Sequence, residues 1–403
     1  MLEADRRAQA LLLRIIDTAV LDARIEFLVE GSVHAAGRGP AAAEGDHGRL
    51  MVRVHRPRFF ARVLAFGNLG MGEAFMDGDF DMERGSLHEL LTTLLGAGLE
   101  NALKQDARLA LAVAATRLRN RLRGKRGNVR RHYDVGEDLF ESFLDSRLMY
   151  SCGYAQSPDD DLERLQTNKL DRVCRKLELG PGDRLLDIGC GFGGLLIHAA
   201  ERFGATGTGY TSSRSHSSRA RAEVARRGLT DRVHIECADY GAIRGAYSKA
   251  VSVGMMEHVP RREYKRFFGV MAAALAPRGM GLLHTIGCNW YRNDHDPFIQ
   301  RYIFPGSSQP RLSEIARGLE TNRLAILDVE NIKPHYRHTV LRWLERFRES
   351  RDALDPVRYS SAFKRMWEYY LSCGIAAASA SNAAVYQVLF SNSHTAPLQL
   401  HRL

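Results

Sequence analysis

The feature that most constrains the fold is a regular alternation of short apolar segments and helical segments between residues 165 and 287. The apolar segments RLLDIG, ATGTGYT, VHIECAD, KAVSVG and GMGLLHTIG have the length of strands, and segments with helical periodicity separate most of them. This alternation is typical of βαβ units that form one doubly wound, mostly parallel sheet. Ligands bind beyond the carboxyl ends of such strands, so the polar residues there are the functional candidates.

The 403 residues are long for a single core and favour two domains. Residues 1–115 combine helical patterns with a strand-like MVRVH at 51–55 and a glycine-rich turn series at 67–80, and they predict a smaller α+β domain. Residues 116–131 contain eight basic residues and no acid, which indicates a basic linker or a contact for anionic phospholipid headgroups. Residues 132–403 remain for the catalytic domain.

Charge and composition narrow the partners and the location. The chain has 57 Lys and Arg against 47 Asp and Glu, a net charge of +10, which favours nucleic acid or an acidic lipid surface. No apolar run is long enough to span a membrane, and the acidic start lacks a cleavage site, so we expect a cytoplasmic protein. The six cysteines form no C-x-x-C pair, which argues for reduced thiols and against a metal site.

A glycine-rich motif, LLDIGCGFGG, follows the first predicted strand of the alternation. Asp187 falls in the strand, and the turn that opens the next helix contains Gly189, Gly191, Gly193 and Gly194. Glycines allow positive φ and close approach of a ligand, and a helix N-terminus offers free N–H groups. A dinucleotide site also needs an acidic residue about twenty positions later. GYTSSRSH at 209–216 has none, so NAD fits poorly.

The motif D-I-G-x-G-x-G-G instead resembles the first motif of class I S-adenosylmethionine methyltransferases. On that resemblance, Thr211 and Ser212 are candidates for the ribose region, and Asp239 for the adenine edge. Asp187 then holds either the glycine turn or the methionyl amine.

The segment GMMEHV places Glu257 where a buried strand is expected to end. Its plain explanation is a helix cap, since a carboxylate favours a helix start. We interpret His258 beside it as structural.

Several sequence blocks stand in the order found in one enzyme family. They are RHYDVGEDLFESFLDSRLMYSCGY, LDIGCGFGG, SVGMMEHV, LLHTIG, DPFIQRYIFPG, PHYRHT and RMWEYYLSC. Together they resemble the cyclopropane-fatty-acyl-phospholipid synthases, relatives of the mycolic acid cyclopropane synthases. RVHRPRFFARVLAFGNLGMGEAFMDGDFD is similar to the extra N-terminal domain of bacterial phospholipid-acting members. The resemblance implies a Rossmann-like class I methyltransferase, plus a smaller N-terminal α+β domain that binds lipid or is accessory.

The resemblance also implies an activity, in which a methylene group passes from S-adenosylmethionine to a cis double bond of an unsaturated phospholipid. A carbocation forms, and a bicarbonate ion acts as the base. The groups implied to hold this ion, or to lie near it, are Glu257, His284, Tyr336, the backbone of Ile286, Cys152 and Cys373. The residues implied to bind S-adenosylmethionine are Tyr150, Ser151, Asp187, Gly189, Gly191, Gly193, Thr211, Ser212, His216, Ala238 and Asp239.

Plainer explanations exist for some of these residues. His284 is also compatible with a core histidine, and the cysteines with small buried residues. Aromatic rings stabilise a cation, and the candidates for lining the reaction cavity are Tyr150, Tyr302, Phe304 and Tyr369.

The chain departs from the family pattern at three places. Phe192 stands where tryptophan is common, His216 replaces a glutamine, and AAASASNAAVYQ at 376–387 replaces F-R-x-R-x-x-Q-L-W-Q. The competing hypotheses are a branched methyl or methylene product, a methyltransferase for a soluble small molecule, and a lipid-binding homologue without turnover. We expect peripheral contact with anionic phospholipid at the inner face of the membrane. The family likeness suggests a homodimer, and no nucleic-acid-binding module is recognised.

Overall fold

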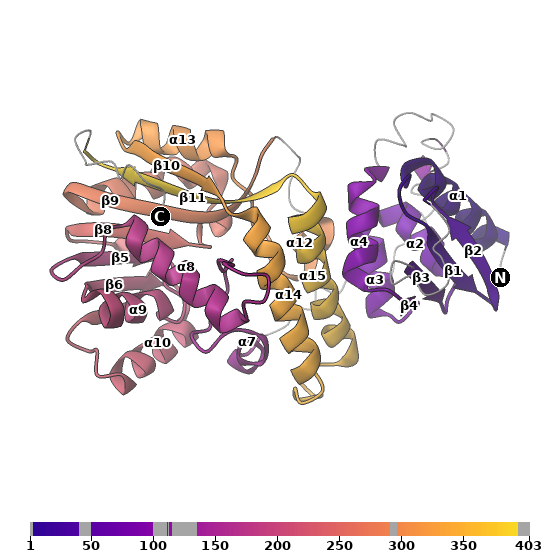
Figure 1. The fold of residues 1–403 in the computed structure, drawn as a ribbon, viewed down its shortest axis with the longest axis horizontal. Helices are drawn as coiled ribbons and strands as arrows, with labels where there is room; N and C mark the ends of the chain where they lie inside the picture. The colour runs from indigo at the N-terminus through magenta and orange to yellow at the C-terminus, as the bar shows by residue number, and fades with distance from the viewer. Residues whose placement is uncertain are drawn as a thin grey trace. The chain divides into compact units, whose positions relative to one another are not determined.

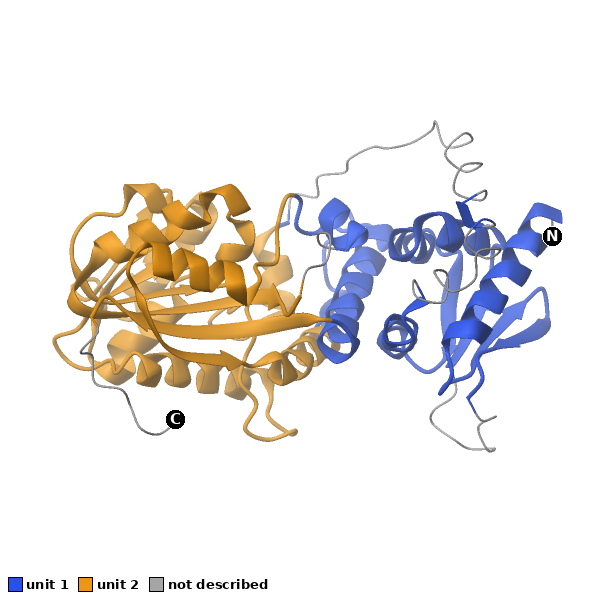
Figure 2. Ribbon diagram, turned by 90° about the horizontal axis from the view of Figure 1, so that it is seen from above, with its two compact units in different colours: residues 1–135, 296–305, 347–381 blue, residues 136–295, 306–346, 382–403 orange. Residues whose placement is uncertain are grey.

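The computed structural model describes residues 3–39, 50–99, 111, 113–114, 135–290 and 296–393. The chain divides into two compact units (Figure 2). Unit 1 contains residues 1–135, 296–305 and 347–381, and unit 2 contains residues 136–295, 306–346 and 382–403. The predicted catalytic domain, 132–403, therefore contributes three segments to unit 1, which are residues 132–135, 296–305 and 347–381. The predicted basic linker, 116–131, lies outside the described residues.

Unit 1 contains a four-stranded sheet with the strand order β2-β1-β3-β4. Its strands are β1 (Ile25–Val29), β2 (Ser32–Ala36), β3 (Leu50–Val54) and β4 (Phe80–Arg84). Its helices include α1 (Glu3–Ala19), α2 (Arg58–Phe66), α3 (Asn68–Met76), α4 (Leu87–Gly96), α12 (Pro297–Tyr302) and α15 (Ser361–Ala380). The strand predicted at 51–55 corresponds to β3, and helices accompany the sheet as an α+β domain requires.

The prediction of a turn series at 67–80 is wrong, because most of this segment forms helix α3. The glycines there serve close packing. A Cβ atom on Gly70 would lie 2.1 Å from the carbonyl oxygen of Arg62 in α2, and one on Gly72 would lie 2.3 Å from the ring of Phe298. Glycine costs helix stability, but here larger side chains would separate α3 from its neighbours.

Unit 2 contains a seven-stranded sheet, within the described residues, with the order β10-β11-β9-β8-β5-β6-β7. The strands are β5 (Arg184–Ile188), β6 (Thr206–Thr211), β7 (Val233–Cys237), β8 (Tyr247–Val253), β9 (Leu275–Cys288), β10 (Ala325–Asn331) and β11 (Ala383–Ser391). Strands β5 to β9 pair in parallel, whereas β11 pairs antiparallel with both β9 and β10 (Figure 1). The predicted mostly parallel, doubly wound sheet is confirmed.

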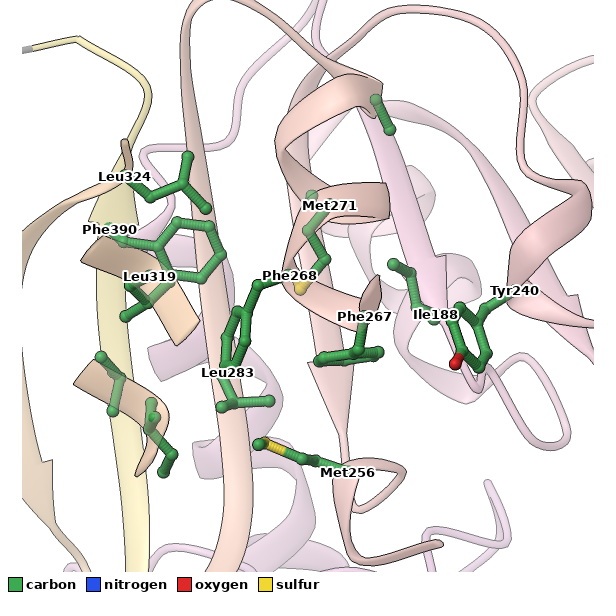
Figure 3. Close-up of a cluster of buried hydrophobic side chains, with 14 of the residues drawn as sticks. Ile188, Tyr240, Met256, Phe267, Phe268, Met271, Leu283, Leu319, Leu324 and Phe390 are labelled. Carbon is green, nitrogen blue, oxygen red and sulfur yellow. The ribbon is translucent and has the colours of Figure 1, made fainter. Parts of the chain in front are cut away.

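Two hydrophobic clusters hold helices against this sheet. One joins α11 (Tyr264–Ala274) and α13 (Leu312–Thr321) to the strands, and includes Phe267, Phe268, Leu319 and Phe390 (Figure 3). The other joins α8 (Leu162–Lys176), α9 (Gly194–Phe203) and α10 (Arg214–Arg226) through residues such as Leu170, Leu196 and Ala220. The buried positions on each helix recur at the spacing of one helical face, which fixes that face against the strands.

Polar residues follow the carboxyl ends of the central strands in unit 2. The glycine turn follows β5, and the short helix η2 (Met256–His258) follows β8. The segment before α8 follows α7 (Glu137–Phe143), and α14 (Lys333–Ser350) follows β10. Since β5 and β8 are neighbours in the sheet, their carboxyl ends bring Asp187 and Glu257 to the same edge.

Candidate active site

A cavity of about 280 Å³ opens at the carboxyl ends of β5, β6, β7 and β8. Most of the predicted S-adenosylmethionine residues line it: Tyr150, Ser151, Asp187, Gly189, Gly191, Thr211, Ser212, His216, Ala238 and Asp239. Gly193 is not among the lining residues and instead precedes the first residue of α9. The structure therefore brings together side chains that are up to 89 residues apart in the sequence, from Tyr150 to Asp239.

The glycine turn gives this cavity a backbone wall. The backbone φ angles of Gly189, Gly191 and Gly193 are 84°, 54° and 80°, a region that residues other than glycine rarely adopt. A Cβ atom on Gly189 would also lie 2.7 Å from Cβ of Met255. The turn ends where α9 begins, so the free N–H groups of that helix are available to a polar ligand.

Asp187 contributes a buried carboxylate to the cavity. It forms no hydrogen bond with any residue that the structure describes, and burial raises its pKa to about 7. The charge of Lys169 opposes this rise. Of the two predicted roles, holding the turn has no supporting hydrogen bond, whereas a carboxylate that faces a cavity suits a cationic ligand.

Lys169, which the sequence did not identify, contacts a residue that lines this cavity. Its side chain is 0% exposed, and its Nζ donates to Oγ of Ser151 at 3.1 Å. Burial lowers the pKa of Lys169 to about 8. The negative charge of Asp145, and to a smaller extent that of Asp187, opposes this decrease. Its position in the predicted helix 165–179 carried no signal of function, because a lysine in an amphipathic helix is usually solvated.

The ribose and adenine candidates also form local turns. Oγ1 of Thr211 accepts a hydrogen bond from the Ser213 amide at 3.3 Å. Oδ1 of Asp239 accepts one from the Gly241 amide at 2.8 Å, which caps the short helix η1 (Tyr240–Ala242). Both residues line the cavity at the same time, so the turns hold them in place.

Two of the departures from the family pattern contact each other in the cavity. The rings of Phe192 and His216 lie 4.3 Å apart with an interplanar angle of 41°. Burial lowers the pKa of His216, so its ring favours the neutral form that packs on an aromatic neighbour. The two changes from the usual residues are therefore a matched pair.

Tyr150 belongs to an aromatic group that the sequence identified only in part. Its ring centroid lies 5.4 Å from Phe140, 5.8 Å from Phe143 and 5.3 Å from Trp343. Phe140 and Phe143 are one helical turn apart in the quoted block RHYDVGEDLFESF, a spacing that placed them on one face of a helix. No local pattern singled out Trp343 in α14.

The other predicted aromatic residues lie in unit 1, where they have structural partners. The hydroxyl of Tyr302 donates to Glu73 at 3.0 Å, and that of Tyr369 donates to Asn68. Phe304 packs edge-on against Tyr370. Their part in lining a reaction cavity stays a prediction.

Glu257 is held by the neighbouring strand. Its Oε1 accepts a hydrogen bond from the Ile286 amide of β9 at 2.6 Å. Its Oε2 is buried and has no partner among the described residues. The residue is 7% exposed, and burial raises its pKa to about 7. The helix-cap explanation does not hold, because Met255 occupies the cap position of η2 and the carboxylate turns to β9.

His284 pairs with a residue that the sequence did not identify. Its Nδ1 accepts from Nε2 of Gln387, 3.3 Å away, so the neutral ring carries its proton on Nε2. Burial lowers the pKa of this 1% exposed histidine to about 3, with the charge of Lys169 as the next cause. Oε1 of Gln387 is buried without a partner in the described part of the chain. Gln387 ends the divergent segment 376–387 and lies opposite His284 in the β9–β11 register.

Cys152, Ile286 and Tyr336 meet in one small hydrophobic cluster with Tyr154, Ile332 and Val385. Ile286 is two residues from His284 on the same strand, so both side chains face the same side of the sheet. The Cys152 thiol donates to the Gly153 carbonyl, and burial raises its pKa to about 12. Cys152 is therefore a neutral thiol and not a nucleophile at ordinary pH.

This second group, which we call the base cluster, contains Glu257, His284, Ile286, Tyr336, Cys152 and Gln387. Its members do not line the 280 Å³ cavity, but their sequence neighbours Ser151, Met255 and His258 do. Cys373 lies in unit 1, where its sulfur accepts a hydrogen bond from Asn68. The predicted place of Cys373 beside the ion stays a prediction.

Within the described residues, no group of His, Cys, Asp and Glu side chains is arranged to hold a metal ion. No helix in that part of the chain is both long and apolar enough to cross a membrane.

Comparison with known proteins identifies close similarity over most of the chain. A family model described as mycolic acid cyclopropane synthetase matches residues 120–388. The cyclopropane-fatty-acyl-phospholipid synthase of Escherichia coli K12 is 39% identical over 342 residues, 84% of this chain and 87% of the relative. The tuberculostearic acid methyltransferase UfaA1 of Mycobacterium tuberculosis is 32% identical over 367 residues, 87% of this chain and 85% of the relative.

Solved structures agree with these matches. The crystal structure of the mycolic acid cyclopropane synthase CmaA1 with SAH and CTAB is 27% identical and superposes with a TM-score of 0.60. The superposition covers 66% of this chain and 97% of the CmaA1 chain.

Proposed function

Because the chain belongs to the mycolic acid cyclopropane synthetase family, we propose that it converts cis double bonds of phospholipid acyl chains into cyclopropane rings. The chain is an S-adenosylmethionine-dependent methyltransferase. The phospholipid substrate is taken from the E. coli relative, whose similarity covers 84% of this chain.

The residues of the 280 Å³ cavity fit S-adenosylmethionine. The glycine turn leaves space against its backbone, and Asp187 offers a carboxylate without a hydrogen-bond partner in the described residues to the positively charged amine of the methionyl end. Thr211 and Asp239 offer oxygen atoms toward the nucleoside end. S-adenosylmethionine supplies an electrophilic methyl group next to a sulfonium.

The reaction needs a base in an apolar place. The π electrons of the alkene form a bond to the methyl carbon while the carbon–sulfur bond breaks, and one alkene carbon becomes positively charged. A proton then leaves the transferred methyl group, and the electrons of that C–H bond close the ring. Tyr150 and its aromatic neighbours present ring faces that stabilise the cation without donating a proton to it.

The base cluster fits a small oxyanion, and we assign it to bicarbonate. Oε2 of Glu257 and Oε1 of Gln387 are buried acceptors without partners in the described residues. Bicarbonate has one O–H group, and we assign that donor to Oε2 of Glu257. The Nε2–H of neutral His284 is a donor toward an anion. When bound, bicarbonate supplies the oxygen that removes the proton. Glu257, whose pKa is raised to about 7, would accept a hydrogen bond from the hydroxyl of the ion and so orient it.

The observation that carries this function is Oε2 of Glu257, a buried oxygen that has no hydrogen-bond partner in the described part of the chain. A methyltransferase whose acceptor is an amine or a hydroxyl has no need of a closed cluster of buried acceptors beside its cofactor. A base for an alkene-derived cation does need one, because water would capture the cation.

The membrane contact is part of the same proposal. The net charge of +10 favours peripheral binding to anionic phospholipid at the inner, cytoplasmic face. The homodimer remains an expectation from family likeness. Salt-sensitive binding to vesicles that contain phosphatidylglycerol is the expected observation.

A branched product is the second candidate, favoured by the 32% identity to a tuberculostearic acid methyltransferase. In that case the same cation loses a proton from a different carbon, the chain keeps a double bond, and no ring closes. The product depends on which proton faces the base, so the base cluster governs both outcomes.

The test is to incubate the purified protein with methyl-labelled S-adenosylmethionine and vesicles of cis-unsaturated phosphatidylglycerol. Mass spectrometry of the released acyl chains then gives the product. A labelled cyclopropane chain supports the proposal, and a labelled branched or methylene chain supports the second candidate. Label found only in a soluble acceptor, or vesicle binding without any label, contradicts both.

A further inference from the structure

A second cavity, of about 290 Å³, lies in unit 2 and shares no lining residue with the cofactor cavity. Four of its lining residues are arginines, Arg164, Arg172, Arg175 and Arg202, and its one carboxylate is Asp171. Most of the lining residues lie on helix α8, which Figure 1 labels. Nothing in the proposed reaction uses this cavity.

Two of the arginines are available to a ligand. Arg164 and Arg175 are exposed and form no side-chain hydrogen bond or ion pair with any residue that the structure describes. They are eleven residues apart, three helical turns, so they lie on the same face of α8. An arginine at each end of a concave wall presents two sets of N–H donors to one ligand.

The rest of the cavity is fixed. The guanidinium of Arg172 donates to both oxygens of Glu330 and lies 4.5 Å from the ring centroid of Tyr154. The ring of Tyr154 also stacks on the ring of His335, with the two centroids 4.0 Å apart. Tyr154 is thus a rigid wall, because an arginine and a histidine both pack on it.

The acidic residue of the cavity is already neutralised. Asp171 is 2.7 Å from Nε2 of His198 and 3.5 Å from the guanidinium of Arg202. Glu330, which pairs with Arg172 and Lys176, is not part of the lining. The carboxylate of Asp160, which is not part of the lining, accepts hydrogen bonds from two lining residues, the Gln156 amide and Nδ2 of Asn168. Arg164 and Arg175 form no ion pair in the described residues, and the excess of arginine over carboxylate in the lining favours anions.

We infer that this cavity binds a phosphate group, with Arg164 and Arg175 as its principal ligands. Arginine is suited to this role because its planar guanidinium donates two parallel hydrogen bonds to phosphate oxygens. The cavity is also next to the base cluster, since Tyr154 lines it and packs against the buried group that contains Cys152.

The source of the phosphate is the headgroup of a phospholipid or a free phosphate ester. The headgroup source rests on the proposed function and deepens it, because the phosphodiester would be held on one side of Tyr154 while an acyl chain is modified elsewhere in the unit. The free-ester source needs no assumption about the reaction.

The test compares two double variants that remove the same charge. The test variant is Arg164→Ala with Arg175→Ala, and the control is Arg262→Ala with Arg317→Ala. The control arginines are also exposed, lie in unit 2 and have no side-chain ion pair in the described residues. All four positions are at the surface, so equal melting temperatures are expected.

The first measurement is turnover on vesicles of cis-unsaturated phosphatidylglycerol. We expect the test variant to raise the apparent KM for lipid about tenfold, with kcat and the Kd for S-adenosylmethionine within twofold of the wild type. The control variant should stay within twofold for all three. Equal rises in both variants would mean that general charge, and not this cavity, attracts the vesicle.

The second measurement is calorimetric titration with glycerol 3-phosphate. If the test variant no longer binds glycerol 3-phosphate and the control variant still does, the cavity is supported as a phosphate site. If the test variant then shows an unchanged apparent KM for lipid, the ligand is assigned to a free phosphate ester. If neither probe distinguishes the two variants, the inference is overturned. A wild-type protein that forms no lipid product sinks the proposed function alone, since the titration still decides the cavity.

Discussion

Asp187 and Glu257 are two buried carboxylates at the same edge of one sheet, and burial raises the pKa of each to about 7. Their surroundings differ. Asp187 faces an open cavity and has Lys169 nearby as a positive charge. Glu257 lies outside that lining, is bound to a backbone amide, and has one oxygen without a partner in the described residues.

The difference separates binding from proton handling. A carboxylate that faces a cavity, with a cation to keep it ionised, is prepared to attract a charged ligand. A carboxylate in a closed place, held by a backbone amide and with one oxygen lacking a partner in the described residues, is sensitive to protonation and suits the control of a proton. The same residue chemistry therefore performs two tasks because the fold gives the two groups different neighbours.

The largest effect is expected for Glu257→Gln. The amide keeps the shape but loses the charge that orients a base, so kcat should fall about 10³-fold. The Kd for S-adenosylmethionine should change less than twofold. Turnover of labelled cofactor and calorimetry measure the two quantities, and Glu223→Gln, on α10, is the control. A parallel loss of cofactor affinity would remove the distinction between the two carboxylates.

The second effect concerns stability and pH. In the unfolded chain both carboxyls lose their protons near pH 4, whereas in the folded protein they do so near pH 7. Between these values the folded state binds more protons, so the free energy of unfolding should decrease as pH rises. At about 1.4 kcal/mol per pH unit, each group contributes about 3–4 kcal/mol to this decrease.

Urea unfolding of the ligand-free protein between pH 5 and 8 measures this decrease in the free energy of unfolding. Glu257→Gln should show a shallower decrease than the wild type, since it lacks one of the two titrating groups. A variant with the wild-type pH dependence would show that Glu257 is already ionised at pH 5.

The third effect is on cofactor binding by Asp187→Asn. Loss of a charged partner for the methionyl end should raise the Kd for S-adenosylmethionine about twentyfold at pH 8, while kcat at saturation falls less than fivefold. At pH 5.5 the wild-type carboxyl is largely protonated, so the two proteins should bind with more similar affinities. A loss of stability without a change in Kd would instead assign Asp187 to the glycine turn.

The smallest effect is expected where Phe192 meets His216. Phe192→Trp and His216→Gln each restore the usual family residue and should each weaken cofactor binding about threefold, because each leaves the other half of the pair mismatched. The Kd of the double variant for S-adenosylmethionine should rise by less than the product of the two single increases, which corresponds to a coupling free energy of about 0.5–1 kcal/mol. Calorimetry on the four proteins decides it, and strict additivity would show that the two rings are independent.

The cofactor cavity was predictable from the sequence because its central wall is local. Asp187 and the following glycines are consecutive, and their conformations are set by the turn between β5 and α9. The base cluster was not predictable in this way. Its residues come from distant segments: the local pattern placed Glu257 at the end of a strand but gave it no chemistry, and only the family resemblance identified His284 and Tyr336.

The misses have a common physical reason. Lys169, Gln387 and Trp343 look ordinary in their local patterns, and their roles arise from what packs against them in the folded unit. The glycines of α3 were misinterpreted for the same reason, since Gly70 serves a contact with α2 that local sequence does not reveal.

The position of β11 has a consequence for the order of assembly. This strand lies between β9 and β10, yet the ribosome makes it after both. The strands that surround the cofactor cavity precede residue 254, whereas His284 receives its glutamine partner only when β11 enters the gap. A nascent chain therefore contains the residues that the proposal assigns to the sulfonium cofactor before it contains the glutamine that completes the base cluster.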